Sequence, residues 1–308
     1  MKPNNILVAG EINPDLILSG NVTPEFGQVE KLVDSVTLAI GSSSAIFACG
    51  AARLGLKVAF VGVCGDDTFG RFMLDEMSKR GLDVSNVVII PGGQTGLSVI
   101  MAQGADRAIL THPGLIAALT AEAVTDDLLR RARHLHVASY FLQTALQPGL
   151  PDLFHRAHAL GLTTSLDTNW DPSCEWCGFD ELLRLVDIFL PNENEALALT
   201  GASTVEQAAA SLVEKCGTVA IKLGARGALA CHEKETARAA ALKVDMIDTV
   251  GAGDAFDAGF LYGWLNGWSL KKALRLAVVC GSLSTRATGG TTAQPGLEEA
   301  MRYVASAG

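Results

Sequence analysis

The segment Asp248-Thr249-Val250-Gly251-Ala252-Gly253-Asp254-Ala255-Phe256-Asp257-Ala258-Gly259-Phe260 joins a short glycine-containing turn to a strongly apolar helix. Gly251 and Gly253 free the backbone to present N–H groups at the helix start, where the helix dipole adds positive potential. The turn therefore predicts a site for developing phosphoryl charge. Asp254 lies in the first helical turn and is placed to accept a proton from an attacking hydroxyl.

A purely structural interpretation covers part of this segment. Small residues recur every four positions and would let another helix approach closely: Ala255, Gly259, Gly263 and Gly267. This spacing does not explain the two glycines of the turn, or the acid that follows them. Other phosphate motifs fail, because residues 65–71 outline a Walker A loop but continue with Arg71-Phe72, and no strand-anchored G-x-G-x-x-G is present.

Length and composition indicate one folded domain over residues 1–308. Apolar residues make up 49% of the chain and charged residues 19%, which is typical of a protein with a large interior. The net charge of −9 disfavours nucleic acid and anionic membrane surfaces as partners. Residues 1–5 lead at once into a short apolar run, too short for a signal peptide or a membrane span. We expect a cytoplasmic protein.

The chain alternates short apolar runs with helix-length segments, which predicts an α/β fold with a doubly wound, mostly parallel sheet flanked by helices. The expected strands are Ile6 to Ala9, Val58 to Val63, Val87 to Ile90, Leu135 to Ala138, Thr163 to Leu166, Asp187 to Leu190 and Val219 to Lys222. The expected helices are Ser44 to Leu54, Thr68 to Arg80, Ala121 to Arg131, Gly149 to Leu160, Val205 to Cys216, Ala252 to Asn266 and Leu270 to Thr285.

Two segments depart from this alternation and predict antiparallel strands, within about residues 12–40 and 94–111. They are Val29 to Ile40, and a hairpin from Leu97 to Gln103 through Gly104-Ala105-Asp106 to Arg107 to Thr111. Such a patch on a doubly wound sheet can form a lid over the carboxyl ends of the strands, where ligands bind. Ordinary edge strands are the alternative.

The sequence resembles the ribokinase-like, or PfkB, family of carbohydrate and nucleoside kinases, in order and over nearly the whole chain. The Asp248 to Phe260 segment is close to the family's C-terminal signature. Further matches are residues 10–15 (GEINPD), Gly41 with residues 51–55 (AARLG), Gly62 with residues 65–67 (GDD) and Gly70, residues 191–195 (PNENE) and residues 222–227 (KLGARG). The resemblance implies the ribokinase fold and ATP-dependent transfer to a hydroxyl of a sugar or nucleoside.

The resemblance also implies site residues. Asp254 would be the base, and the backbone of Gly251, Ala252 and Gly253 the anion hole. Asn13 and Asp15 would bind the acceptor's hydroxyls. Asn192 and Glu195 match the family's N-x-x-E motif, which organises Mg²⁺ and its waters near the phosphates of ATP. Residues that would flank the nucleotide are Lys222, Gly224, Gly227, Val279 and Ser282.

Two further properties of the family are left open by the sequence. Asp248 and Val250 match positions that support a monovalent cation such as K⁺ in some members. The lid pairs between subunits in relatives, which suggests a homodimer.

The acceptor pocket departs from the family pattern G-G-x-x-x-N, which becomes Gly41-Ser42-Ser43-Ser44-Ala45-Ile46. Ile46 cannot hydrogen-bond a sugar hydroxyl, so the acceptor has fewer hydroxyls there, an apolar group, or another partner such as Ser42 or Gln143. Asp171 stands where the family often has a basic residue, which disfavours an acceptor that already carries a phosphate or carboxylate. The alternatives to a sugar kinase are a nucleoside kinase and a catalytically silent sensor of a sugar or nucleotide.

Overall fold

The computed structural model describes residues 5–103, 106–176 and 179–305. Its main sheet has eight strands in the order β14-β13-β12-β11-β10-β9-β1-β4. The strands from β12 to β4 are parallel, and the hairpin β13–β14 adds an antiparallel edge. Their bounds are β1 Ile6–Ala9, β4 Val58–Val61, β9 His134–Val137, β10 Thr163–Leu166, β11 Ile188–Phe189, β12 Thr218–Lys222, β13 Ala228–His232 and β14 Glu235–Ala239.

Helices cover both faces of this sheet, and their bounds are α1 Ser43–Arg53, α2 Thr68–Lys79, α3 Asp126–Arg130, α4 Leu150–Ala159, α5 Asp180–Leu183, α6 Glu193–Thr200, α7 Val205–Val213, α8 Ala252–Leu265, α9 Leu270–Ser284 and α10 Leu297–Ala305. The expected α/β class is confirmed. None of the described helices is long and apolar enough to cross a membrane.

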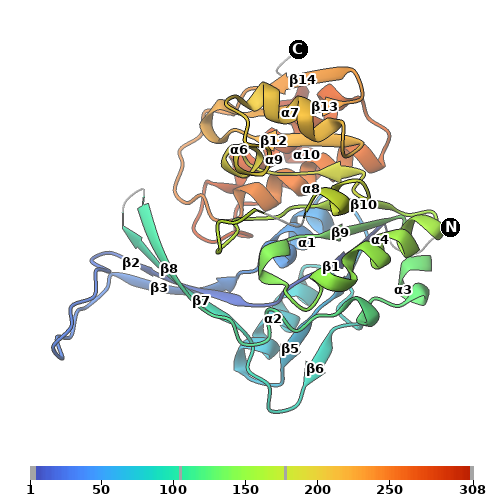
Figure 1. Ribbon diagram of the computed structural model, residues 1–308. Coiled ribbons are helices and arrows are strands. Elements are labelled where there is room, and N and C mark those ends of the chain that lie inside the picture. Colours follow the sequence, from blue (N-terminus) through green and yellow to red (C-terminus); the bar gives the residue numbers. More distant parts are fainter. Residues whose placement is uncertain (1–4, 104–105, 177–178, 306–308) are drawn as a thin grey trace.

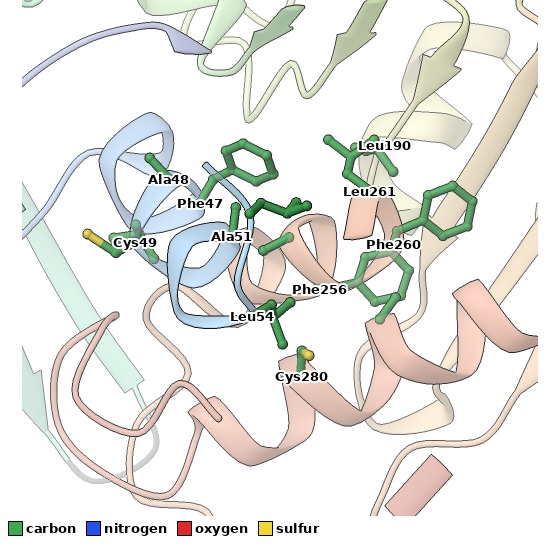
Figure 2. Packing of buried hydrophobic residues seen from close by; sticks show 14 of the residues in the cluster. Phe47, Ala48, Cys49, Ala51, Leu54, Leu190, Phe256, Phe260, Leu261 and Cys280 are labelled. Atoms are coloured by element: carbon green, nitrogen blue, oxygen red, sulfur yellow. The ribbon is translucent and has the colours of Figure 1, made fainter. Parts of the chain in front are cut away.

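Two cores result because successive side chains of a strand point to opposite faces of the sheet. On β1, Ile6 and Val8 join the core beneath α1, α8 and α9, whereas Leu7 and Ala9 join the core beneath α4 and α7. Phe47 of α1 and Phe256 of α8 belong to the first core (Figure 2). This packing fixes the start of α8 relative to the sheet.

Close contact between α8 and α9 explains the small residues of the first motif. A Cβ built on Gly259 would lie 2.8 Å from the Cα of Ala277, and one on Gly263 would lie 2.7 Å from the Cβ of Ala273. Side chains at these positions would push the helices apart. The helix-packing interpretation therefore holds for Gly259 and Gly263, but not for Gly267, where an added Cβ would have no atom within 4 Å.

A second sheet leaves the α/β body to one side (Figure 1). Its order is β3-β2-β7-β8, with bounds β2 Pro14–Ser19, β3 Ser35–Ile40, β7 Leu97–Gln103 and β8 Asp106–His112. The β2–β3 and β7–β8 pairs are antiparallel, and β2 and β7 are parallel. We call this sheet the lid. The predicted turn residues Gly104 and Ala105 lie outside the described residues.

Several expected boundaries differ from those observed. Residues 29–34 precede strand β3, because the β2–β3 ladder ends at the pair Ser19 and Ser35. Strand β6, Val88–Ile90, pairs with β5, Val63–Gly65, in a separate two-stranded sheet. The expected helix at 121–131 is a 3₁₀ turn, Ala121–Ala123, followed by α3. The sequence patterns do not predict α5, α6, α10 or the β13–β14 hairpin, because these segments are short or weakly periodic.

Candidate active site

A cavity of about 280 Å³ lies between the lid and the carboxyl ends of the parallel strands. Ligands of doubly wound sheets bind at this edge. The predicted residues that line it are Asn13, Asp15, Ser42, Ile46, Val250, Gly251 and Asp254. Residues from the two ends of the chain thus meet in one cavity, which also receives lid residues such as Ser98 and Arg107.

Asp254 lies in the first turn of α8 and is only 7% exposed. Burial raises the pKa of its carboxyl well above the ordinary value, the negative charge of Asp167 raises it further, and the ammonium of Lys222 opposes this rise. A carboxylate whose pKa is raised toward neutrality is a better proton acceptor than an ordinary aspartate. The geometry therefore allows Asp254 to take a proton from a hydroxyl in the cavity.

The turn before α8 has a backbone conformation that suits glycine. Gly251 is the N-cap, with φ 71°, and Ala252 and Gly253 begin the helix. The first N–H groups of a helix lack partners four residues earlier and carry partial positive charge. The N–H of Ala252 donates a long hydrogen bond of 3.3 Å to the carbonyl oxygen of Thr249. We call residues 251–253 the anion turn.

Asp15 stands at the opposite wall of the cavity, at the start of β2. Burial raises the pKa of its carboxyl to about 7, although the guanidinium of Arg107 lowers it and Asp248 raises it. Gly41 makes room for this side chain, because a Cβ there would lie 2.2 Å from Oδ1 of Asp15. Asn13, nearby, donates from its amide to the hydroxyl of Ser98 at 3.3 Å.

Ser42 and Ile46 of the departing motif, and the alternative partner Gln143, have different surroundings. The hydroxyl of Ser42 donates to the carbonyl oxygen of Glu11 and accepts from the N–H of Ala45. Ile46 is 3% exposed and packs against the anion turn. Gln143 is fully buried, and its amide donates to the carbonyl oxygen of Ala138 at 2.6 Å. It is not among the residues that line the cavity.

Several polar residues of the cavity were not predicted from the sequence, and three of them follow strands of the parallel sheet: Glu11, Ser139 and Asn169. The carboxylate of Glu11, 3% exposed, accepts hydrogen bonds from Ser44 and, at 2.9 Å, from the hydroxyl of Ser139. Asn169 donates to Ser139 at 2.8 Å and has a φ of 52°. Their positions in the sequence could have identified them, because each follows the end of a parallel strand by two or three residues, where ligands of such sheets bind.

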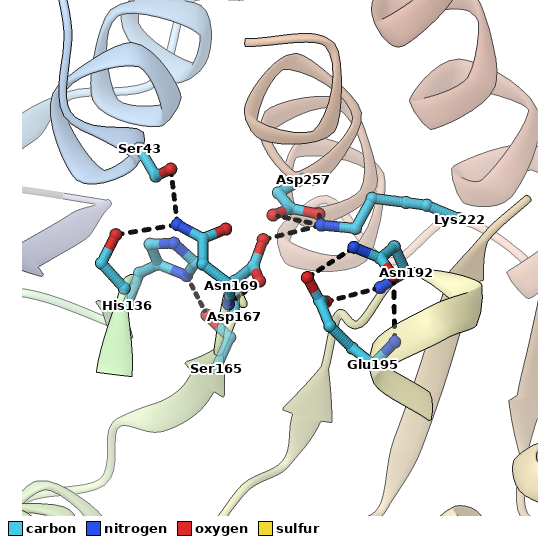
Figure 3. A network of polar contacts seen from close by, with 10 residues as sticks. Ser43, His136, Ser165, Asp167, Asn169, Asn192, Glu195, Lys222 and Asp257 are labelled. Atoms are coloured by element: carbon cyan, nitrogen blue, oxygen red, sulfur yellow. Dashed lines mark hydrogen bonds and ion pairs between the residues drawn. The ribbon is translucent and has the colours of Figure 1, made fainter. Parts of the chain in front are cut away.

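Figure 3 shows a buried polar network around Lys222, Asp167 and Asp257. Carboxylate oxygens of Asp254, Asp167 and Asp257 lie within 4.8 Å of one another, so Asp254 adjoins this network. The ammonium of Lys222, at the end of β12, is 2.7 Å from Asp167 and 3.1 Å from Asp257. The ammonium holds the pKa of Asp167 low against the effect of burial. Asn192 caps α6 in a reciprocal arrangement with Glu195, whose carboxylate accepts from both the backbone and the side chain of Asn192.

Burial raises the pKa of Glu195 to about 7, with a further contribution from Asp167. Both Asn192 and Glu195 offer oxygen atoms of the kind that Mg²⁺ prefers, and the carboxylate lies in a negatively charged environment. The donor set therefore fits an ion held through water molecules.

The remaining predicted nucleotide residues lie around β12 and α9. Gly224 and Gly227 bound the turn after β12, with φ values of 57° and 94°. A Cβ on Gly227 would lie 1.9 Å from the carbonyl oxygen of Ala239, so only glycine fits there. Val279 is fully buried in the core, whereas the hydroxyl of Ser282 accepts from the N–H of Leu242.

Asp248 forms hydrogen bonds to two loops beside the anion turn. Its carboxylate accepts from the N–H of Val250 at 2.9 Å and from the N–H of Gly289 at 2.8 Å. Arg107 of the lid reaches the same place and donates to the hydroxyl of Thr249 at 3.2 Å. The lid thus contacts the segment that leads into the anion turn.

The family model described as pfkB family carbohydrate kinase matches residues 3–296. The chain belongs to the pfkB family. It is a kinase, a phosphotransferase that uses an alcohol group as acceptor, as the resemblance implied. Similar proteins include a ribokinase of Haemophilus influenzae, 28% identical over 97% of this chain and 98% of the relative. A 2-dehydro-3-deoxygluconokinase of Bacillus subtilis is 30% identical over 92% and 91%.

Solved structures of the pfkB type share the fold. A putative ribokinase II from E. coli, in complex with ATP and Mg²⁺, superposes with a TM-score of 0.87 at 23% identity, covering 98% of this chain and 99% of that chain. An adenosine kinase from Sinorhizobium meliloti gives a TM-score of 0.86 at 24% identity, covering 97% and 99%. These similarities establish the ribokinase fold expected from the sequence, with its lid.

Proposed function

We propose that this pfkB kinase transfers the γ-phosphoryl group of ATP to a hydroxyl of a small, uncharged, sugar-like acceptor, with Asp254 as the base. The observation that carries the proposal is the shared cavity of Asp254, Asn13 and Asp15 at the N-terminus of α8. Asn13 and Asp15 orient the acceptor, Asp254 takes its proton, and the amides of the anion turn face the transferred group.

On the donor side, the nucleotide lies along β12 and the turn from Gly224 to Gly227, with Lys222 beside its phosphates and Ser282 toward its base. Val279, which the resemblance also implied, is fully buried in the core and does not face the nucleotide. Asn192 and Glu195 hold Mg²⁺ through water, and the bound ion supplies neutralisation of phosphate charge. Since ATP is the donor, we place the reaction in the cytoplasm. Asp248 and Val250 are the candidates for supporting a monovalent cation such as K⁺.

An uncharged acceptor is supported by the charges of the cavity. Glu11, Asp15 and Asp254 are carboxylates, and Arg107 is the cationic side chain among its lining residues. An anionic group on the acceptor would repel the carboxylate of Glu11 and would disfavour the ionised forms of Asp15 and Asp254, whose pKa values burial already raises. Asp171 stands where the family often has a basic residue, and its carboxylate accepts hydrogen bonds from the backbone of its own loop. This position therefore offers no positive charge to an anionic acceptor.

A nucleoside is the second candidate acceptor, and the apolar part of the cavity favours it. Ile46, Ile109 and Leu142 line the same space as the polar residues. Leu142 and Ile109 are 39% and 51% exposed, so a planar base could cover them. A monosaccharide would leave this surface in water.

A dimer through the lid is supported by exposed apolar side chains on its outer strands. Val36 and Leu38 of β3 are 60% and 37% exposed, and Leu110 of β8 is 63% exposed. Burial of such side chains favours association. We propose one kinase domain per chain, residues 1–308, and two chains per particle. Analytical ultracentrifugation of the Val36→Glu and Leu110→Glu variants tests the dimer, and unchanged sedimentation would refute it.

The acceptor is identified by incubating sugars and nucleosides with ATP and Mg²⁺ and measuring ADP release. We expect the Asp254→Asn variant to lose at least about 10²-fold in kcat while keeping its affinity for ATP. A wild-type protein that binds ligand tightly but transfers no phosphoryl group would instead be a sensor. Full activity of Asp254→Asn would remove Asp254 from the base role.

A further inference from the structure

Three elements bring one ammonium and three carboxylates together beside the anion turn. Lys222 ends β12, Asp167 follows β10, and Asp254 and Asp257 lie one turn apart on α8. Oxygen atoms of the three acids lie within 4.8 Å of one another. Asp167 and Asp257 are 2% and 1% exposed, so their charges are shielded from water (Figure 3).

The ammonium of Lys222 is held from one side and faces the anion turn on another. Its Nζ lies 2.7 Å from Oδ2 of Asp167 and 3.1 Å from Asp257. A Cβ built on Gly253 would lie 3.6 Å from this Nζ, and the side chain of Lys222 is the nearest group that it would meet. The missing side chain of Gly253 therefore leaves the ammonium next to the backbone of the turn.

We infer that Asp167 is a positioning residue of the kinase reaction, holding the ammonium of Lys222 beside Gly253 so that it contacts the phosphoryl group during transfer. The inference rests on the proposed function. In the step itself the acceptor's hydroxyl oxygen forms a bond to the γ-phosphorus, and the bond from that phosphorus to the bridging oxygen of ADP breaks. The hydroxyl proton passes to Asp254, and Lys222 keeps its protons throughout.

A fixed cation is effective here because it needs no reorganisation as charge develops on the transferred group. A free lysine side chain would lose conformational entropy on binding phosphate. The ion pair with Asp167 has already restricted Lys222 in the folded protein. Asp257 contributes a second acceptor for the same ammonium.

The same two charges act on the base in opposite directions. Asp167 raises the pKa of Asp254 by repulsion, and Lys222 lowers it by attraction. Removal of the Asp167 charge should therefore move the acidic limb of the kcat–pH profile to lower pH. Removal of the Lys222 charge should move it to higher pH. These shifts report the charges that act on Asp254, whereas contact of Lys222 with the phosphoryl group is measured by the loss of kcat at the pH optimum of each variant.

The test compares Asp167→Asn, Lys222→Met, Lys222→Arg and the double variant Asp167→Asn/Lys222→Met. We expect Lys222→Met to lose about 10²-fold in kcat with a change in the Kd of Mg·ATP of less than about fivefold, and Lys222→Arg to recover part of the loss. The double variant should match Lys222→Met in kcat, because Asp167 acts through the lysine. If Asp167→Asn alone does not fold, the double variant remains usable, because both members of this ion pair are then neutral.

Lys215→Met is the matched control, since Lys215 forms an exposed ion pair with Asp180 away from the cavity. Calorimetric titration of the wild type with Mg·ATP distinguishes a failure of the proposed function from a failure of the role inferred for Asp167. A wild type that neither binds Mg·ATP nor phosphorylates any acceptor refutes the proposed function. An active wild type with unchanged kcat and pH profile in Lys222→Met, or additive losses in the double variant, overturns the role of Asp167.

Discussion

Ile46 of α1 packs directly against Gly251 of the anion turn. A Cβ on Gly251 would lie 2.8 Å from Cγ2 of Ile46, and a Cβ on Gly290 would lie 2.5 Å from Cδ1 of the same side chain. The isoleucine that replaces the family's asparagine thus has a packing role as well as an effect on the acceptor. Its side chain packs against the loops that contain Gly251 and Gly290, beside the N-terminus of α8.

Shortening this side chain tests that role. Ile46→Val removes Cδ1, and we expect a loss of about 0.5–1.5 kcal/mol in the free energy of unfolding. Cδ1 lies against Gly290, and Gly290 lies next to Gly251. The anion turn therefore loses indirect support, and kcat should fall more than the KM for ATP rises. Urea unfolding and steady-state kinetics measure the two effects, and a stability loss with unchanged kcat would limit Ile46 to packing.

The Gly251→Ala variant tests the conformation of the anion turn. We expect at least about a tenfold loss of kcat, since alanine is strained at φ 71° and its Cβ would meet Ile46 and Gly290. Gly267→Ala is the matched control, with φ 68° and open space around the added Cβ. It should be destabilised by about 1 kcal/mol and keep its activity; equal activity in both variants would contradict an active role for the turn.

The buried carboxyl of Asp15 should make stability depend on pH. Its pKa is about 7 in the folded protein and 3.8 as the ordinary value, so the unfolded chain releases this proton first and folding becomes less favourable as pH rises through this window. Asp15→Asn does not titrate. We expect its stability relative to the wild type to improve by about 2–3 kcal/mol between pH 5 and pH 8.

Chemical denaturation at the two pH values measures this change, and kinetics at pH 8 should show a higher KM for the acceptor. A relative stability that is the same at pH 5 and pH 8 would show that Asp15 ionises normally in the folded protein.

Glu195 should affect the requirement for Mg²⁺ as well as the start of α6. In Glu195→Gln the capping partner of Asn192 becomes neutral, and we expect a loss of about 1 kcal/mol in stability and a severalfold higher Mg²⁺ concentration for half-maximal activity. Thr204→Ala removes the cap of α7, where the hydroxyl accepts from Gln207. It should cost similar stability without changing the Mg²⁺ requirement, and a Mg²⁺ curve unchanged in Glu195→Gln would argue against the metal role.

The sequence alone determined the α/β class, the turn that opens α8 and the position of Asp254 within its first helical turn. These features are local, since the spacing of apolar residues, two glycines and an acid decide them within about a dozen neighbouring positions. The family signature added roles for residues far from this segment. Of the acceptor residues named from the sequence, Asn13, Asp15, Ser42 and Ile46 line the cavity, whereas Gln143 does not.

Tertiary structure decided which distant residues meet. Asp167 and Lys222 are 55 positions apart, and Arg107 and Thr249 are 142 apart, so no local pattern pairs them. The close fit of Asp15 into the space left by Gly41, and of Ile46 against Gly251, depends on how helices and lid pack on the sheet. Buried charges and shape complementarity arise only when that packing excludes water, which is why the sequence could name the base but not its surroundings.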